Sequence, residues 1–207
     1  ICHGKTRESA IEITRNALKD YIVQTNKTNI PYLQSIIDND DFINNKIDTS
    51  YCEKHQNELV DAMHKMRDDI KKEDVVALFL FYDFNKRYLE YKAIDNVWEE
   101  VGYWRYNMNI TVSVEQSAVS GQLSAVYNVN IEKINPKSLK CNINGQDYEV
   151  LLTQNGGDIN KVMINGMTES IFVSETSDNN YCVHFRGLDF ICRRNDELND
   201  SKDYSNT

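Results

Sequence analysis

The sequence predicts an α+β chain, in which N-terminal helices precede an eight-stranded antiparallel β-barrel wrapped around a central hydrophobic helix. Three observations support this prediction. The hydrophobic period is helical up to about residue 91 and becomes two-residue alternation between 110 and 194. One helical stretch is apolar on every side, and Asn-Gly pairs recur among the alternating segments. Helices followed by a run of strands indicate an α+β fold or two separate units.

The helical half begins with two short helices. The first is expected over 7–22, with Thr6 as its N-cap. The second is expected over 31–37 and starts at a proline, which suits a first helical turn. Residues 42–52 are expected to be irregular, and a charged helix over 53–73 follows them.

The segment 75–89 predicts a helix that must be enclosed. It is too short to cross a bilayer, and Asp74, Asp83 and Lys86 lie close to or within it. A helix that is apolar all round requires cover on every side. The apolar positions are Val75, Val76, Leu78, Phe79, Leu80, Phe81, Tyr82, Phe84, Tyr88 and Leu89.

The second half supplies that cover. Eight candidate strands lie near 109–115, 123–133, 138–144, 146–154, 158–165, 167–175, 180–186 and 188–194. Asn-Gly is a strong hairpin signal because both residues tolerate positive φ. The expected turns are Asn144-Gly145, Asn155-Gly156, Asn165-Gly166 and Arg186-Gly187. A meander of eight hairpin-linked strands closes into a barrel to remove its edges, and the apolar helix fills its interior.

Composition narrows the class of partner and the compartment. A formal net charge of −9 and a pI near 5.0 argue against nucleic acid or an anionic membrane as a partner. The five cysteines are odd in number and none are at C-x-x-C spacing, so neither a disulfide framework nor a zinc site is expected. This cysteine usage favours a cytoplasmic protein, or a mitochondrial-matrix one in a eukaryote.

Candidate sites of chemistry in the sequence are weak. The run Gly4-Lys5-Thr6, just before a predicted helix, is similar to the end of a phosphate-binding loop. No predicted strand precedes it, as such a loop requires. Cys2-His3 lacks metal-ligand partners at useful spacing, and His55, His64 and His184 are scattered. We therefore expect no catalytic residue and no metal site in this chain.

Three short motifs in order resemble biotin carboxylases. Residues 4–11, Gly-Lys-Thr-Arg-Glu-Ser-Ala-Ile, resemble the G-x-T-R-E-x-A-I segment that opens the last helices of the biotin carboxylase C-terminal lobe. Residues 28–31 resemble the T-N-I-P of the next helix. Phe42 and Thr49 fit a closing F-x-x-G-x-x-x-T, although Asn45 replaces the glycine.

The remainder resembles the domain that links biotin carboxylase to carboxyltransferase in propionyl-, methylcrotonyl- and related acyl-CoA carboxylases, the BT domain. In that family a barrel surrounds a long helix, and a hook between them grips neighbouring subunits. Trp98 and the run Gly102-Tyr103-Trp104-Arg105-Tyr106-Asn107 resemble the W…G-x-R-x-N of that hook. The hook residues implied to bind a partner are Trp98, Tyr103, Trp104 and Arg105. The other interpretation of these aromatics is a core plug closing one end of the barrel.

The resemblance implies a division of the chain. It comprises a biotin carboxylase remnant at 1–53, a connecting helix at 54–72, a BT-like domain at 73–194 and a disordered polar tail at 195–207. Within the BT-like domain the central helix is expected at 73–90, the hook at 91–108 and the barrel at 109–194. The chain opens at Ile1 without an initiator Met, which also suggests a fragment.

The resemblance also implies the chemistry of a parent protein, a ligase that carboxylates biotin with ATP, Mg²⁺ or Mn²⁺ and bicarbonate. The fragment itself is expected to bind no cofactor and to be inactive, with Thr49 at the edge of the adenine pocket. Its expected partners are the carboxyltransferase subunit, other biotin carboxylase subunits and the biotin carrier domain. The alternative is an independent, lipocalin-like barrel that binds a small ligand, and a self-contained enzyme ranks last.

Overall fold

A computed structural model describes residues 1–23, 28–92, 108–116, 125–156, 159–176 and 180–195. The chain forms two compact units. The helical unit comprises 1–71 with the turn residues 186–188, and the barrel unit comprises 72–185 with 189–207. Each unit is described separately below.

The helical unit contains five helices where the sequence predicted two and part of a third. They are α1 (Arg7–Asp20), α2 (Ile30–Asp38), α3 (Asp40–Ile43), α4 (Tyr51–Lys54) and α5 (Gln56–Asp68). Helix α2 packs against both α1 and α5. The short helices α3 and α4 lie where an irregular segment was expected. Single helical turns carry almost no periodic signal, so they escape a search for hydrophobic repeats.

The expected connecting helix over 54–72 is interrupted. Helix α5 ends at Asp68, and the central helix α6 (Lys72–Lys92) is a separate element. The N-terminal end of a helix is the positive end of its dipole and is stabilised by acidic side chains. The C-terminal end is negative and is stabilised by basic side chains. Lys65 and Arg67 in the last turn therefore suit the C-terminal end of α5, and Glu73 and Asp74 stabilise the first turn of α6.

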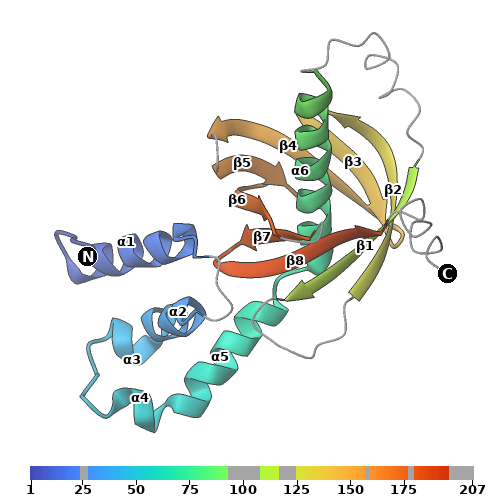
Figure 1. Ribbon diagram of the computed structural model, residues 1–207. Helices are drawn as coiled ribbons and strands as arrows, with labels where there is room; N and C mark the ends of the chain where they lie inside the picture. The colour runs from blue at the N-terminus through green and yellow to red at the C-terminus, as the bar shows by residue number, and fades with distance from the viewer. Residues whose placement is uncertain (24–27, 93–107, 117–124, 157–158, 177–179, 196–207) are drawn as a thin grey trace. The chain divides into compact units, whose positions relative to one another are not determined.

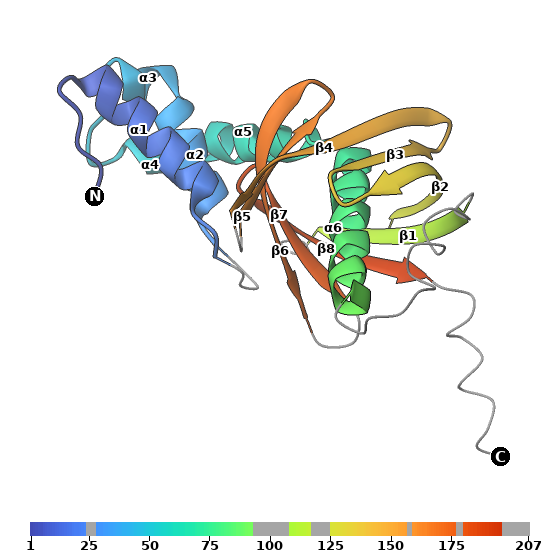
Figure 2. The same cartoon turned by 90° about the horizontal axis from the view of Figure 1, so that it is seen from above.

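Helix α6 is enclosed, as the sequence predicted. Every side chain from Val75 to Leu80 has 0% of its surface exposed, and Phe81 and Phe84 are buried. Figures 1 and 2 show the strands standing around α6 in two perpendicular views. The side chains expected to extend this apolar surface at Tyr88 and Leu89 fall outside the described residues.

The eight strands form a closed antiparallel barrel in chain order, each paired with its neighbours and β1 with β8 (Figure 1). Their bounds are β1 (Met108–Gln116), β2 (Ala125–Asn135), β3 (Ser138–Ile143), β4 (Gln146–Gly156), β5 (Ile159–Ile164), β6 (Met167–Glu175), β7 (Tyr181–Phe185) and β8 (Leu188–Asn195). Strand number, order and approximate position confirm the prediction.

Alternation creates the barrel core. On β4, Val150 is fully buried and pairs with buried Leu139 on β3 and buried Ile164 on β5. Glu149, the residue before Val150, is exposed and pairs with Lys140 on β3. One side of each strand thus contributes to a continuous apolar interior, and apolar residues of α6 complete it.

Three of the four predicted turns are confirmed by their backbone. Asn144-Gly145, Asn165-Gly166 and Arg186-Gly187 have positive φ at both residues, which is the geometry of a type I′ hairpin. Asn155-Gly156 is different, because both residues are paired strand residues at the end of β4. A register shift between Leu152 and Gln154 moves the pairing, so the connection falls on 157–158, outside the described residues.

Candidate functional site

The first motif, at residues 4–11, starts helix α1. Thr6 is extended, and its side-chain oxygen accepts a hydrogen bond from the Ser9 backbone N–H at 3.2 Å. It is therefore a true N-cap. A Cβ on Gly4 would lie 2.8 Å from the Ser9 carbonyl carbon, closer than a real side chain approaches. The glycine of the motif is thus required by space and not by phosphate binding.

Arg7 connects the first motif to the third. Its Nη2 donates to the Phe42 carbonyl oxygen at 2.5 Å and its Nε to the Ile43 carbonyl oxygen at 3.4 Å. The guanidinium also lies over the Phe42 ring, 5.2 Å from the centroid. These carbonyls stand at the end of α3, where orphan acceptors need partners. Arg7 and Phe42, distant in sequence, thus form one structural contact.

The departure from the glycine pattern at residue 45 has a backbone explanation. Asn45 has φ of 58°, the left-handed region that glycine adopts freely. Asparagine tolerates this region better than other side chains. Asn45 therefore adopts a backbone conformation that the glycine of the motif would also allow.

Thr49, expected at the edge of an adenine pocket, lies exposed in the turn before α4. The organising residue of that turn is its neighbour Asp48. Its carboxylate accepts from the Ser50 backbone N–H and hydroxyl and from Lys54 Nζ at 2.7 Å. The Lys54 bond, followed by the Ser50 hydroxyl, lowers the pKa of Asp48 to about 2. The assignment of Thr49 to the edge of an adenine pocket therefore stays a prediction.

The predicted hook residues, Trp98, Tyr103, Trp104 and Arg105, lie outside the described residues. The segment 93–107 follows α6 directly in the chain. The docking and core-plug interpretations of its aromatics therefore both remain predictions.

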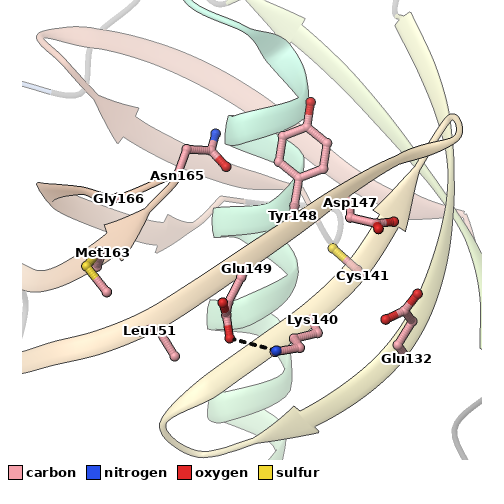
Figure 3. A pocket seen from close by; sticks show the side chains of 10 residues that line it. All are labelled: Glu132, Lys140, Cys141, Asp147, Tyr148, Glu149, Leu151, Met163, Asn165 and Gly166. Carbon is pink, nitrogen blue, oxygen red and sulfur yellow. Dashed lines mark ion pairs between the residues drawn. The ribbon is translucent and has the colours of Figure 1, made fainter.

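A groove of about 340 Å³ lies across strands β2 to β5 and the turn after β5 (Figure 3). Carboxylates of Glu132, Asp147 and Glu149 line it, and Lys140 bonds Glu149 at 3.1 Å. The groove is polar and open, and its charge is mainly negative. It contains no arrangement of base and nucleophile. The remaining lining residues are Cys141, Tyr148, Leu151, Met163, Asn165 and Gly166.

The part of the chain that the structure describes contains one buried histidine–carboxylate pair. His184 Nδ1 lies 2.7 Å from Asp189 Oδ1, and both side chains are less than 9% exposed. The His184 Nε2 atom is buried and has no partner. A triad would need a nucleophile within hydrogen-bond reach of that nitrogen.

Three of the cysteines are buried in the barrel unit, at positions 141, 182 and 192. Burial raises the pKa of the Cys141 and Cys182 thiols to about 12 and shifts that of Cys192 in the same direction. The thiolate is the reactive form, so these three groups are inert near neutral pH. All five cysteines are free thiols, and Cys2 and Cys52 are the two outside the barrel core.

Among the residues that the structure describes, no group of three or more His, Cys, Asp or Glu side chains could hold a metal ion. Within the same described ranges, no helix combines the length and apolar character needed to span a membrane.

Comparisons with known proteins point to the same N-terminal motifs. Residues 1–54 match the family described as the biotin carboxylase C-terminal domain. The N-terminal segment is similar to a biotin carboxylase. A chloroplastic biotin carboxylase of Arabidopsis thaliana is 45% identical over 61 residues, and biotin carboxylase 2 of Populus trichocarpa is 44% identical over 59. These matches show that part of the chain is similar to biotin carboxylases, and the family match places the similarity within residues 1–54.

The extent of the similarity is limited. The two matches cover 30% and 28% of this chain and 11% of each relative. The chain therefore spans about a tenth of the length of the biotin carboxylases that it resembles. The family match ends at residue 54, before α5 and the barrel.

The polar contacts within the barrel were missed by sequence reasoning. Asp83, on the apolar helix, has 0% exposure and lies 3.3 Å from Arg194 Nη1. An acidic residue in the middle of an apolar helical run is the signal that could have indicated a buried partner. That partner, Arg194, is 111 residues away in the sequence, and closure of the barrel brings it next to Asp83.

Proposed function

We propose that this chain belongs to a biotin-dependent acyl-CoA carboxylase, or a related one, and joins its biotin carboxylase and carboxyltransferase components. In this proposal residues 1–53 complete the biotin carboxylase domain, and 73–194 form the docking domain. The chain itself is non-catalytic. Its partners are the carboxyltransferase subunit, neighbouring biotin carboxylase subunits and the biotin carrier domain.

The observation that carries the proposal is the order of elements. A segment similar to the biotin carboxylase C-terminal domain is followed by an apolar helix inside a closed eight-stranded barrel. That order is the one implied by the resemblance to the BT domain.

The parent reaction is proposed on the same basis. ATP and bicarbonate would carboxylate biotin, and a carboxyltransferase would then load an acyl-CoA. No step of this reaction is assigned to a residue of this chain. Thr49 is the single residue placed near the nucleotide, and its assignment rests on the motif alone. The cytoplasm, or the matrix of an organelle, is the proposed location.

Replacing Trp104 and Arg105 by alanine tests the docking role. Large aromatic and arginine side chains dominate binding energy at protein interfaces, so the double substitution should weaken assembly with the carboxyltransferase subunit at least tenfold. The measurement is co-purification with that subunit, with circular dichroism confirming that the barrel remains folded. The matched control is Lys140→Met with Glu149→Leu, an exposed pair on the barrel. Equal capture of the hook variant and the control would refute the hook as the docking element.

The second candidate is the ligand-binding barrel, which requires an empty lumen. Helix α6 occupies that lumen, with side chains from Val75 to Leu80 fully buried. A fluorescent fatty acid is a direct probe of this rival function. We expect no saturable fluorescence change, and saturable binding at micromolar concentration would favour the lipocalin-like interpretation.

A further inference from the structure

The apolar middle of α6 does not define its own orientation in the barrel. Residues on every side of the helix are buried from Val75 to Phe81. Hydrophobic attraction is non-directional and depends mainly on the area removed from water. Apolar burial alone therefore distinguishes poorly between alternative rotations of the helix, and directional polar contacts discriminate more sharply.

Directional contacts occur instead toward the C-terminal half of α6. Asp83 is fully buried, and its Oδ2 lies 3.3 Å from Nη1 of Arg194 on β8. The Arg194 guanidinium also lies 5.5 Å from the centroid of the Phe84 ring. A buried charge without its partner is costly, so rotation of the helix away from Arg194 is penalised.

A second pair at the same end joins α6 to β6. Lys86 Nζ forms an ion pair with Glu175, the last residue of β6. The same ammonium lies 5.6 Å from the ring centroid of Tyr181, the first residue of β7. The Tyr181 ring also contacts Phe79, with 5.3 Å between centroids.

The opposite end of α6 has its own polar contact. Asp74, in the first turn and 7% exposed, accepts a hydrogen bond of 2.8 Å from Asn165 Nδ2. Asn165 lies in the turn before β6, whereas Glu175 lies at the end of that nine-residue strand. Polar contacts thus attach α6 at both ends of the barrel.

We infer that Asp83–Arg194, Lys86–Glu175 and Asp74–Asn165 fix the rotation and depth of α6 within the barrel. Asp83 and Asp74 are the buried members of these pairs, whereas Asn165 and Glu175 are exposed. Buried polar groups are well attested as determinants of register, even where they add little stability. The segment 93–107 continues from α6, so the same contacts set the position from which it leaves the helix. That consequence rests on the proposed docking function, whereas the register itself does not.

The test replaces Asp83 by Leu and Arg194 by Met together, in the full 207-residue chain. Removing both charges avoids an unpaired buried ion, so cooperative thermal unfolding should persist. Methyl-labelled NMR spectra report the register without any partner protein. We expect the single set of Val75, Leu78 and Leu80 methyl signals to become doubled or exchange-broadened. One sharp set in the variant would overturn the inference.

A milder variant keeps the test decisive if the double variant does not fold. Lys86→Met removes a side chain that is 29% exposed and leaves the Asp83–Arg194 pair intact. Broadening of α6 methyl signals, with unchanged far-ultraviolet circular dichroism, supports the inference. Line widths equal to those of the Lys140→Met, Glu149→Leu control contradict it.

Discussion

Residues 1–71 and the barrel unit are stabilised by different means. Among the described residues of 1–71, the buried apolar side chains are Ile11, Ile30, Pro31, Tyr51, Leu59 and Ile70. The motif residues make individual polar contacts near the surface. In the barrel unit, by contrast, α6 and the strands share one continuous apolar interior.

This difference predicts how each region responds to substitution. An enclosed core transmits damage to the whole unit, because interiors are close-packed and have no water to solvate an inserted charge. A substitution that removes a contact near the surface, such as the one from Arg7 to Phe42, should affect only the residues around that contact. The following predictions compare the two regions in order of expected effect.

Phe81→Asp should have the largest effect. Phe81 is 3% exposed on α6, so the substitution creates a cavity and inserts an unpaired carboxylate. We expect a loss of about 4 kcal/mol or more in the free energy of unfolding, enough to unfold the barrel unit. Urea unfolding monitored by circular dichroism measures this. Met167→Asp is the matched control, because Met167 is 54% exposed on the same barrel and its change should stay within about 0.5 kcal/mol. Similar losses for both variants would mean that α6 is not enclosed.

Arg7→Ala should have a smaller, local effect. It removes two hydrogen bonds to the end of α3 and the contact with the Phe42 ring. We expect a loss of about 1.5 kcal/mol, with faster amide exchange confined to 1–71. Lys5→Ala removes the same charge from an exposed neighbour and should change little. Faster amide exchange in the barrel strands of the Arg7 variant would show that the stabilities of the two regions are not independent.

Asn45→Ala and Asn45→Gly should act in opposite directions. Alanine in the left-handed region costs about 1 kcal/mol, whereas glycine adopts it without a steric penalty. Thermal unfolding of the two variants should therefore place the glycine variant above the alanine variant. If the alanine variant is as stable as the glycine variant, the positive φ at residue 45 does not matter.

The pH dependence of the turn before α4 is the smallest expected effect. The pKa of Asp48 is about 2 in the folded chain, below the ordinary 3.8. Its contribution is therefore complete above about pH 4 and is lost as the pH falls toward 2. Carboxyl NMR shifts of Asp48 should titrate with a midpoint near 2, and Lys54→Met should raise that midpoint. A wild-type midpoint near 4 would mean that the Lys54 contact is not formed.

The two regions also differed in what sequence could predict. Alternation and Asn-Gly turns specified the barrel, because strand period and positive φ are local properties. The helices α3 and α4 could not be found in this way. They depend on non-local contacts such as the one from Arg7, which lies 35 residues from Phe42. The motifs around Gly4 and Asn45 were recognised as a pattern, and the contacts that explain them became visible only in the structure.

The position of a turn along the chain was harder to predict from the sequence than the number of strands. Asn155-Gly156 has the same turn chemistry as Asn144-Gly145, yet it extends β4, because pairing with β5 across a register shift determines where the hairpin turns. Similarly, the sequence placed Asp83 close to or within the apolar run but gave no sign that it is buried or that Arg194 is its partner.

Amide hydrogen exchange of α6 is the most direct test of the enclosed helix on which the account depends. Amides from Val75 to Phe81 should exchange only through unfolding of the whole barrel unit, and therefore more slowly than those of α1. Exchange in this stretch as fast as in α1 would contradict the enclosure of α6, and with it the proposed docking domain.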